Sequence, residues 1–376
     1  MIILLIIFSF LAIYYLTCAL FISAGIRKVK SEKREASPNE FISVIIPFRN
    51  ESENILRNIE SIIKQDYPLD NYEVIYVDDK SEDDSLEKII KAEKPCNMKV
   101  ISVPSDYLSD SSKIRAIKFG IDNSKGEIIL ITDCDCIHNS KWLDSMLKCF
   151  NHQTGFVAGP VAFIDEGTVF NKLQKLEFTG LILATAGLIG INKPIICNSA
   201  NLAFRKKAYD LAGGFQINAN SFSSADEFLM LSIKNKTVYK VKFSWDKNSV
   251  ARTIASSSIK DFFSQRKRWA SKDWKQFGIG ILSGLILVYL FFAGLIVQLI
   301  LGIFSSVIFL YAFIVSLVIK FMSESLILKY GRELYYNQKI FRIFLLAEFF
   351  HIPYILFAVI SGLFGGFTWK NRKNNK

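Results

Sequence analysis

The hydrophobic positions separate two apolar ends from a middle with ordinary soluble patterning. Residues 1–24 and the region after residue 276 carry apolar runs long enough to cross a bilayer, which takes roughly 20 residues. From Phe41 onward, short apolar runs alternate with amphipathic stretches. The pattern predicts a membrane protein with a soluble middle.

The soluble middle alternates between strand and helix patterns. The runs FISVIIP, YEVIYVDD, MKVISV and EIILITD predict buried strands, and the segments between them have helical spacing. This alternation favours an α/β fold with a mostly parallel sheet and helices on both faces. Ligands of such sheets bind beyond the carboxyl ends of the strands.

Polar clusters follow three of these strands. They are PFRNE at 47–51, VDDKS at 77–81 and TDCDC at 132–136. Because the strands are expected to be parallel, the three clusters should converge on one crevice. For any single cluster the alternative is that its aspartates only end a strand or cap a helix.

The third cluster contains paired carboxylates and paired thiols. Without a P-loop or a GxGxxG motif, an acidic crevice can bind a pyrophosphate only if a divalent cation screens the repulsion. Oxygen ligands favour Mg²⁺ or Mn²⁺. Residues two apart on a strand share a side, so we expect Asp133 and Asp135 to face the ligand and Cys134 and Cys136 to face away. A Cys-x-Cys zinc site is the alternative, for which the middle offers only two histidines.

Six ordered segments resemble family 2 glycosyltransferases. They are SVIIPFRNE, VIYVDDKSEDDS, ITDCDC, CNSANLAFRKKAYDLAGGF, SSADEFLML and QRKRW. They are most similar to the membrane-bound group that includes cellulose, chitin, hyaluronan and poly-N-acetylglucosamine synthases. The resemblance runs from Phe41 to Trp274 and implies a GT-A fold, a nucleotide-sugar donor, Mg²⁺ or Mn²⁺, and inversion at the anomeric carbon.

The resemblance also implies roles for individual residues. Asp226 matches the general base that takes a proton from the acceptor hydroxyl. Asp133 and Asp135 match the D-x-D pair, with Asp135 as the direct metal ligand. The other matched positions lie around the nucleotide sugar (Pro47, Arg49, Glu51, Asp78, Asp79, Lys113) or close over the diphosphate and the acceptor (Gln265, Arg268, Trp269).

The sequence departs from the family beside the base. Relatives carry an acid just before it, whereas here Ala225 precedes Asp226 and Glu227 follows. A register with Glu227 as the base is therefore an alternative. Asp226 as a plain helix N-terminal acid and Trp269 as a membrane-interface anchor are further alternatives.

The apolar ends predict a topology. Basic residues follow the first run, so the positive-inside rule predicts a retained anchor, not a cleaved signal peptide, with 25–275 in the cytoplasm. The run 277–319 suits two crossings with a turn near 298–302. The last run is predicted to cross; a re-entrant or interfacial segment is the alternative.

These patterns divide the chain into eight segments. They are a transmembrane helix (1–25), a basic linker (26–40), a GT-A domain (41–256), an amphipathic interface helix (257–275), two transmembrane helices (276–297 and 301–320), a transmembrane or re-entrant segment (343–367) and a basic tail (368–376).

The net charge and the number of predicted membrane spans limit which partners the protein can have. The net charge is +11, and much of the basic excess lies beside hydrophobic segments, which suits anionic lipid at the cell inner membrane better than nucleic acid. A solvated basic face is the alternative. About four spans are few for one chain to enclose a polymer channel. A saccharide polymer made with homo-oligomerisation or interface helices, and single transfer to a lipid-linked acceptor, both stay open.

Two other function classes are weighed. A non-catalytic nucleotide-sugar-sensing membrane subunit needs neither a base nor a Q-x-x-R-W motif. A nucleotidyltransferase wants a glycine-rich basic loop, which IIPFRNE is not.

Overall fold

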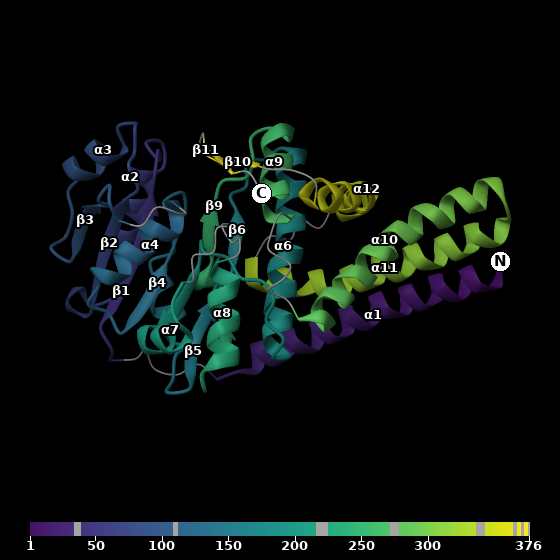
Figure 1. Ribbon diagram of the computed structural model, residues 1–376, viewed down its shortest axis with the longest axis horizontal. Helices are drawn as coiled ribbons and strands as arrows, with labels where there is room; N and C mark the ends of the chain where they lie inside the picture. Colours follow the sequence, from purple (N-terminus) through teal and green to yellow (C-terminus); the bar gives the residue numbers. More distant parts are fainter. Residues whose placement is uncertain are drawn as a thin grey trace. The chain divides into compact units, whose positions relative to one another are not determined.

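The computed structural model describes residues 1–33, 39–107, 112–215, 225–270, 278–335, 343–363, 367–369 and 372–374. These residues form two compact units (Figure 1). The α/β unit comprises Lys28–Glu166 and Asn192–Ala255. The helical unit comprises Met1–Arg27, Gly167–Ile191 and Ser256–Lys376.

A seven-stranded sheet forms the centre of the α/β unit. Its strands lie in the order β3-β2-β1-β4-β7-β5-β8, and β7 alone runs antiparallel to its neighbours. The mostly parallel α/β sheet is therefore confirmed. The strand bounds are β1 Ile42–Phe48, β2 Tyr72–Asp78, β3 Met98–Ser102, β4 Ile128–Ile131, β5 Thr154–Ala158, β7 Leu202–Arg205 and β8 Lys240–Phe243, with β6 Val161–Phe163 and β9 Ala251–Thr253 pairing separately.

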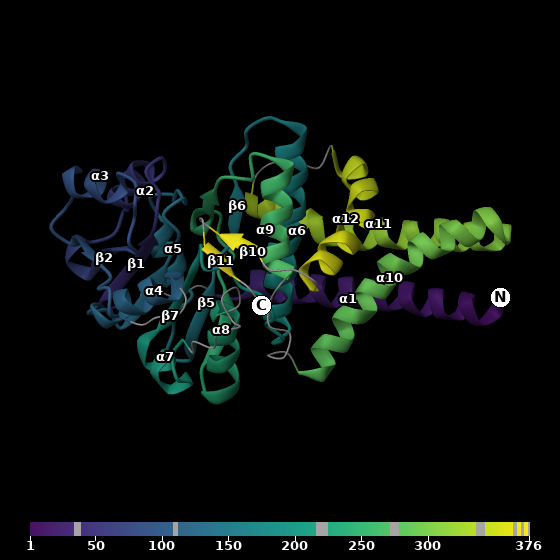
Figure 2. The same cartoon turned by 45° about the horizontal axis from the view of Figure 1, so that its top comes forward.

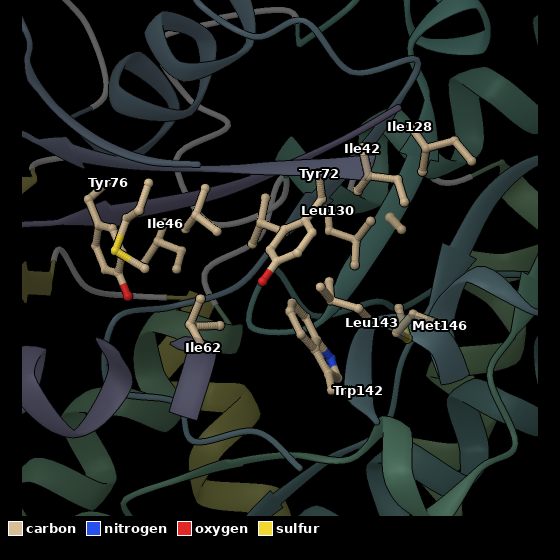
Figure 3. Close-up of a cluster of buried hydrophobic side chains, with 14 of the residues drawn as sticks. Ile42, Ile46, Ile62, Tyr72, Tyr76, Ile128, Leu130, Trp142, Leu143 and Met146 are labelled. Atoms are coloured by element: carbon tan, nitrogen blue, oxygen red, sulfur yellow. The ribbon is translucent and has the colours of Figure 1, made fainter. Parts of the chain in front are cut away.

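Helices cover both faces of this sheet. On one face, Ile42 and Ile46 of β1 and Leu130 of β4 pack with Trp142 and Met146 of α5 (Figure 3). On the other face, α4 approaches Ile45 and Val77 so closely at Gly120 that a Cβ there would lie 2.6 Å from Ile45 Cγ2. The helix bounds are α2 Ile55–Ile63, α3 Ser85–Lys91, α4 Ser112–Asp122, α5 Trp142–Leu147, α7 Lys206–Ala212 and α8 Ala225–Lys236, with 3-10 turns η1 Leu69–Asn71 and η2 Lys247–Ser249.

The register brings three strand ends to one edge. Phe48 at the end of β1 pairs with Asp78 at the end of β2, and Ile45 pairs with Ile131 at the end of β4. The polar clusters that follow these strands therefore start at the same edge of the sheet.

Among the described residues, four helices are long and apolar enough to cross a membrane, namely Ile2–Ser31, Ile279–Phe304, Val307–Tyr335 and Phe344–Ser361. Figure 2 shows α10 and α11 as a helical hairpin. The element bounds are α1 Ile2–Ser31, α6 Val169–Gly190, α9 Ile259–Ala270, α10 Ile279–Phe304, α11 Val307–Tyr335, α12 Phe344–Leu363, β10 Phe367–Trp369 and β11 Arg372–Asn374.

The α10–α11 turn lies later than predicted. It falls at Ser305 and Ser306, beyond the predicted 298–302. Gln298 stays within α10 because its side chain is buried and its Oε1 accepts a hydrogen bond from Ser316 Oγ at 3.1 Å. α11 continues beyond the predicted end at 320 because Lys320 is buried between carboxylates of α11 and α12.

The predicted domain 41–256 is interrupted in the structure. Gly167–Ile191 belongs to the helical unit, since α6 packs closely against α1. The other segment bounds also shift: α1 extends to Ser31 into the predicted linker, and α9 ends at Ala270. Residues 34–38 and 271–275, and part of the predicted tail, lie outside the described residues.

α12 lies beside α9 and steeply across α10 and α11. Phe262 contacts Tyr354 with ring centroids 5.4 Å apart, and Phe263 contacts Phe357 at 5.0 Å. Figure 1 shows α12 nearly end-on, whereas α10 and α11 run lengthwise. By length and composition α12 is one of the four that could cross a membrane, so its predicted crossing stays a prediction.

The α1–α6 crossing generates a stability prediction. A Cβ at Gly187 would lie 2.5 Å from the Ile22 carbonyl oxygen, so Gly187→Ala must push the two helices apart. We expect a loss of about 1–3 kcal/mol of stability, measured as earlier thermal unfolding in detergent. The matched control is Gly180→Ala on the same helix, where a Cβ meets nothing within 4 Å. Equal unfolding temperatures for the two variants would contradict the close crossing.

Candidate active site

The first two polar clusters are joined by arginines around Asp79. Arg49 Nη1 donates to the Asp79 carbonyl at 3.0 Å, and Arg115 Nε of α4 donates to Asp79 Oδ1 at 3.1 Å. All three side chains are buried. Arg49 Nη2 also pairs with Glu82 at 2.7 Å. Arg115 therefore pairs with the Asp79 carboxylate, while Arg49 binds the backbone carbonyl of the same residue.

The other predicted residues of these clusters have local structural contacts. Pro47 lies within β1 opposite Val77. Asp78 Oδ1 accepts a hydrogen bond from the Ser81 amide at 3.0 Å, which stabilises the turn after β2. Glu51 Oε2 accepts from Asn54 Nδ2 at 2.9 Å.

Lys113 connects the third cluster to the segment before β7. Its Nζ lies 2.7 Å from Asp133 Oδ1 and donates to Ser199 Oγ at 2.6 Å. On the other side of the D-x-D pair, Thr253 Oγ1 at the end of β9 donates to Asp135 Oδ2 at 3.0 Å. The structure therefore places Lys113 against Asp133 of the D-x-D pair.

The DCDC segment is a turn, so the strand argument for its alternation is wrong. β4 ends at Ile131, and the Cys136 amide donates to the Asp133 carbonyl at 3.1 Å. Asn58 Nδ2 of α2 donates to the Cys136 carbonyl at 2.7 Å and holds the turn. The turn still buries Cys134 and Cys136 and leaves the two carboxylates partly exposed.

The thiols have no features of a zinc site. Burial raises the pKa of Cys136 well above its usual value, which disfavours the thiolate that zinc requires. His138 Nε2 lies 3.0 Å from Thr132 Oγ1, and its ring packs on Trp142. Within the described ranges, no three His, Cys, Asp or Glu side chains gather around a point that could hold a metal.

The two D-x-D carboxylates are suited to a cation whose other ligands come from a bound phosphate. Burial, together with the nearby charges of Asp133 and Glu51, raises the pKa of Asp135 to about 6. Negative charge is therefore in excess beside Asp135. Two protein oxygens with the remaining ligands from phosphate is the usual arrangement for Mg²⁺ or Mn²⁺.

Asp226 lies in the first turn of α8 with one oxygen unsatisfied. Its Oδ1 is buried and has no hydrogen-bond partner in the described part of the chain. Burial raises the pKa of Asp226 to about 6, the charges of Glu227 and Asp133 raise it and that of Lys113 lowers it, and a Ser199 hydrogen bond also lowers it. A carboxylate with a pKa near neutrality and an unused acceptor is suited to general-base chemistry.

Gln265, Arg268 and Trp269 lie on α9, in the helical unit. Gln265 Oε1 accepts from Ser256 Oγ at 3.4 Å. Trp269 stacks on Phe178 of α6 with ring centroids 5.6 Å apart. The three predicted residues therefore share one amphipathic helix.

Sequence reasoning missed four residues that support the site: Asn58, Arg115, Ser199 and Thr253. Arg115 had one usable signal, since it lies two positions after Lys113 in a segment already matched to the nucleotide. The others are short polar side chains whose partners are distant in sequence, and no motif marks them.

Comparisons with known proteins agree with the resemblance. The models for Glycosyl transferase family 2 and Glycosyl transferase family group 2 match residues 43–211 and 128–323, the latter just over half of the chain. Glycosyltransferase AglE of Haloferax volcanii is 28% identical over 179 residues, which cover 46% of this chain and 56% of that protein. Poly-beta-1,6-N-acetyl-D-glucosamine synthase of Staphylococcus epidermidis is 24% identical over 247 residues, 64% of this chain and 56% of that one. The chain thus spans little more than half the length of these relatives.

A solved structure is similar to almost the whole chain. Mannosyltransferase PcManGT from Pyrobaculum calidifontis, in complex with GDP-Man and Mn2+, matches with a TM-score of 0.54 and 16% identity, covering 96% of this chain and 99% of that one. At this identity the likeness concerns the fold, and it confirms the predicted GT-A fold.

The Asn58 contacts predict that the D-x-D turn depends on this side chain. Asn58→Ala removes the hydrogen bond to the Cys136 carbonyl and leaves the buried Tyr76 hydroxyl without its acceptor. We expect a loss of about 1–3 kcal/mol in stability, measured by thermal unfolding. Asn123→Ala, at the exposed end of α4, is the matched control. If both variants unfold at the same temperature, Asn58 does not hold the turn.

Proposed function

The chain belongs to glycosyl transferase family 2, and from this membership we propose that it is a membrane-bound inverting enzyme. It transfers a sugar from a UDP-sugar to a saccharide or lipid-linked acceptor in cell-surface polysaccharide or glycolipid synthesis. The observation that carries the proposal is Asp226, a partly exposed carboxylate with one buried and unused oxygen and with Lys113 and Asp133 nearby.

The donor's nucleobase is assigned to the surroundings of Asp79. Uracil presents one N–H donor flanked by carbonyl acceptors, which a carboxylate flanked by guanidinium groups complements. The Asp79 carboxylate is paired with Arg115, and the Arg49 guanidinium is bound to the backbone carbonyl of the same residue. Pro47, Glu51 and Asp78 lie at or beside the ends of the same two strands.

The donor's diphosphate is assigned to the D-x-D turn. Asp135 and Asp133 would hold Mg²⁺ or Mn²⁺, which when bound neutralises the charge that grows on the departing diphosphate. Lys113, already paired with Asp133, adds a positive charge at the same place. The Mn2+ and GDP-Man bound to the similar mannosyltransferase support a divalent cation at this turn.

The transfer step is a single displacement. The acceptor oxygen attacks the anomeric carbon, the bond from that carbon to the diphosphate breaks, and the acceptor proton passes to Asp226. The unpartnered Oδ1 of Asp226 is available to receive that proton. Gln265, Arg268 and Trp269 are assigned to the diphosphate and the acceptor sugar. A non-catalytic sensor would need no carboxylate of this kind.

The membrane assignment follows from composition. Four apolar helices and the basic residues after the first run favour a cell-membrane protein with its catalytic unit in the cytoplasm. The saccharide polymerase among the relatives supports a saccharide acceptor, and a lipid-linked acceptor stays an equal alternative.

The proposal predicts metal-dependent turnover. Purified protein in lipid, given UDP-, GDP- and dTDP-sugars with candidate acceptors, should release UDP and form a glycoside only with Mn²⁺ or Mg²⁺. Asp226→Asn should lower kcat by about 10²–10⁴, the usual contribution of a general base, and Asp135→Asn should abolish the metal dependence together with activity. Glu227→Gln is the matched control. Full turnover in Asp226→Asn with loss in Glu227→Gln would move the base by one residue, and turnover without a cation would refute the metal assignment.

The raised pKa of Asp226 predicts a pH profile. The base works only when ionised, so kcat/KM should fall as pH drops through the pKa, which lies at about 6 without a cation. A bound cation favours the ionised form and moves the midpoint lower. The profile should persist in Glu227→Gln. Activity that increases as the pH falls below 6 would contradict a carboxylate base.

A further inference from the structure

Arg266, which lies inside the Q-x-x-R-W segment at a position the motif leaves open, anchors α9. Its guanidinium is 3% exposed. Nε donates to both carboxylate oxygens of Glu177 on α6, at 3.0 and 3.1 Å, and Nη2 pairs with the same group. A bidentate pair of this kind fixes orientation as well as distance.

Arg266 also contacts two residues of the motif itself. Its Nη1 donates to Gln265 Oε1, and its Cζ lies 4.2 Å from the centroid of the Trp269 ring. The Phe262 ring is 4.5 Å away from the same carbon. The position of Arg266 therefore influences the side chains of both Gln265 and Trp269.

Glu177 is held in turn by α12. Tyr354 OH donates to Glu177 Oε1 at 2.7 Å. The Glu177 carboxylate thus receives hydrogen bonds from α9 and α12 at once. Its loss would leave the buried Arg266 charge without its partner, which is costly in a desolvated site.

α12 is itself held by a buried ion pair and by a histidine–carboxylate contact. Glu348 pairs with Lys320 of α11, and His351 Nδ1 lies 3.4 Å from Glu324 Oε2. Glu324 also lies 2.9 Å from Lys320 Nζ and accepts a hydrogen bond from Tyr15 OH of α1 at 2.8 Å. Ionisable groups within apolar helices are kept in pairs because water cannot solvate them there.

We propose that Glu177, Arg266 and Tyr354 form a positioning network that sets the Q-x-x-R-W helix for transfer. The network rests on the proposed function, since it serves the step in which Gln265 and Trp269 close over diphosphate and acceptor. It makes the geometry of α9 depend on α6 and on the ion-paired helix α12. The three residues are positioning residues and touch no reacting atom.

The test is the ratio of nucleoside diphosphate released to sugar transferred. This ratio does not depend on the amount of folded enzyme, so a purely structural defect leaves it unchanged. A misplaced motif lets water compete with the acceptor and raises the ratio. Glu177→Gln should raise it and lower the kcat of transfer by about tenfold or more, as displacement of positioning groups does, while the KM for the donor stays within about twofold.

Matched variants separate the network from general damage. Tyr354→Phe removes one hydroxyl and should shift the ratio in the same direction by a smaller factor, which decides the question if Glu177→Gln fails to fold. Glu93→Gln and Tyr311→Phe make the same chemical changes at exposed sites and should match the wild type.

Two outcomes would overturn the inference in different ways. If the wild type transfers sugar and Glu177→Gln or Tyr354→Phe shows the same ratio as the wild type, the network is overturned and the proposed function is not. A wild type that transfers no sugar from any donor to any acceptor overturns the proposed function, and the network with it.

Discussion

Negative charge held at one edge of the sheet is the constraint on which the rest of the site depends. The parallel register of β1, β2 and β4 brings their acidic ends together, and carboxylates that are buried side by side repel one another. Asp79 is balanced by Arg115, and Asp133 by Lys113. Asp135 accepts a hydrogen bond from the Thr253 hydroxyl and forms no comparable ion pair among the described residues, and burial raises its pKa. The uncompensated negative charge beside Asp135 is what makes the site suited to a cation, and the cation in turn makes it suited to a diphosphate.

In the helical unit the buried charges that need a partner are positive instead of negative. Arg266 and Lys320 are buried cations, and each is held by a carboxylate from another helix. Pairing a charge across helices fixes which helices are neighbours, because an unpaired partner would remain desolvated. The helix that carries the Q-x-x-R-W residues is therefore placed by electrostatic contacts as well as by its aromatic face. The Q-x-x-R-W helix and the long apolar helices of this unit are thus linked through ion pairs and hydrogen bonds.

The α/β unit was readable from sequence because its signals are local. Runs of valine and isoleucine predict β1, β2 and β4, and the polar clusters directly after them predict the site. The rest depends on pairs distant in the chain: Thr253 reaches Asp135 across 118 positions and Arg266 reaches Glu177 across 89. The packing of α6 against α1 could not be predicted for the same reason, because glycine contacts between helices leave no periodic pattern in the sequence. The DCDC segment was predicted to continue the strand because polar aspartates and small apolar cysteines alternate there with the period of a strand.

The most direct test of the central claim is the binding of Mn²⁺ to the purified protein, followed by its paramagnetic resonance signal, with and without UDP. If the D-x-D turn and a diphosphate share the cation, UDP should tighten Mn²⁺ binding, Mn²⁺ should tighten UDP binding by the same factor, and Asp135→Asn should remove both effects. UMP, which lacks the second phosphate, should produce little coupling. Mn²⁺ binding that ignores UDP, or coupling that survives in Asp135→Asn, would contradict the account.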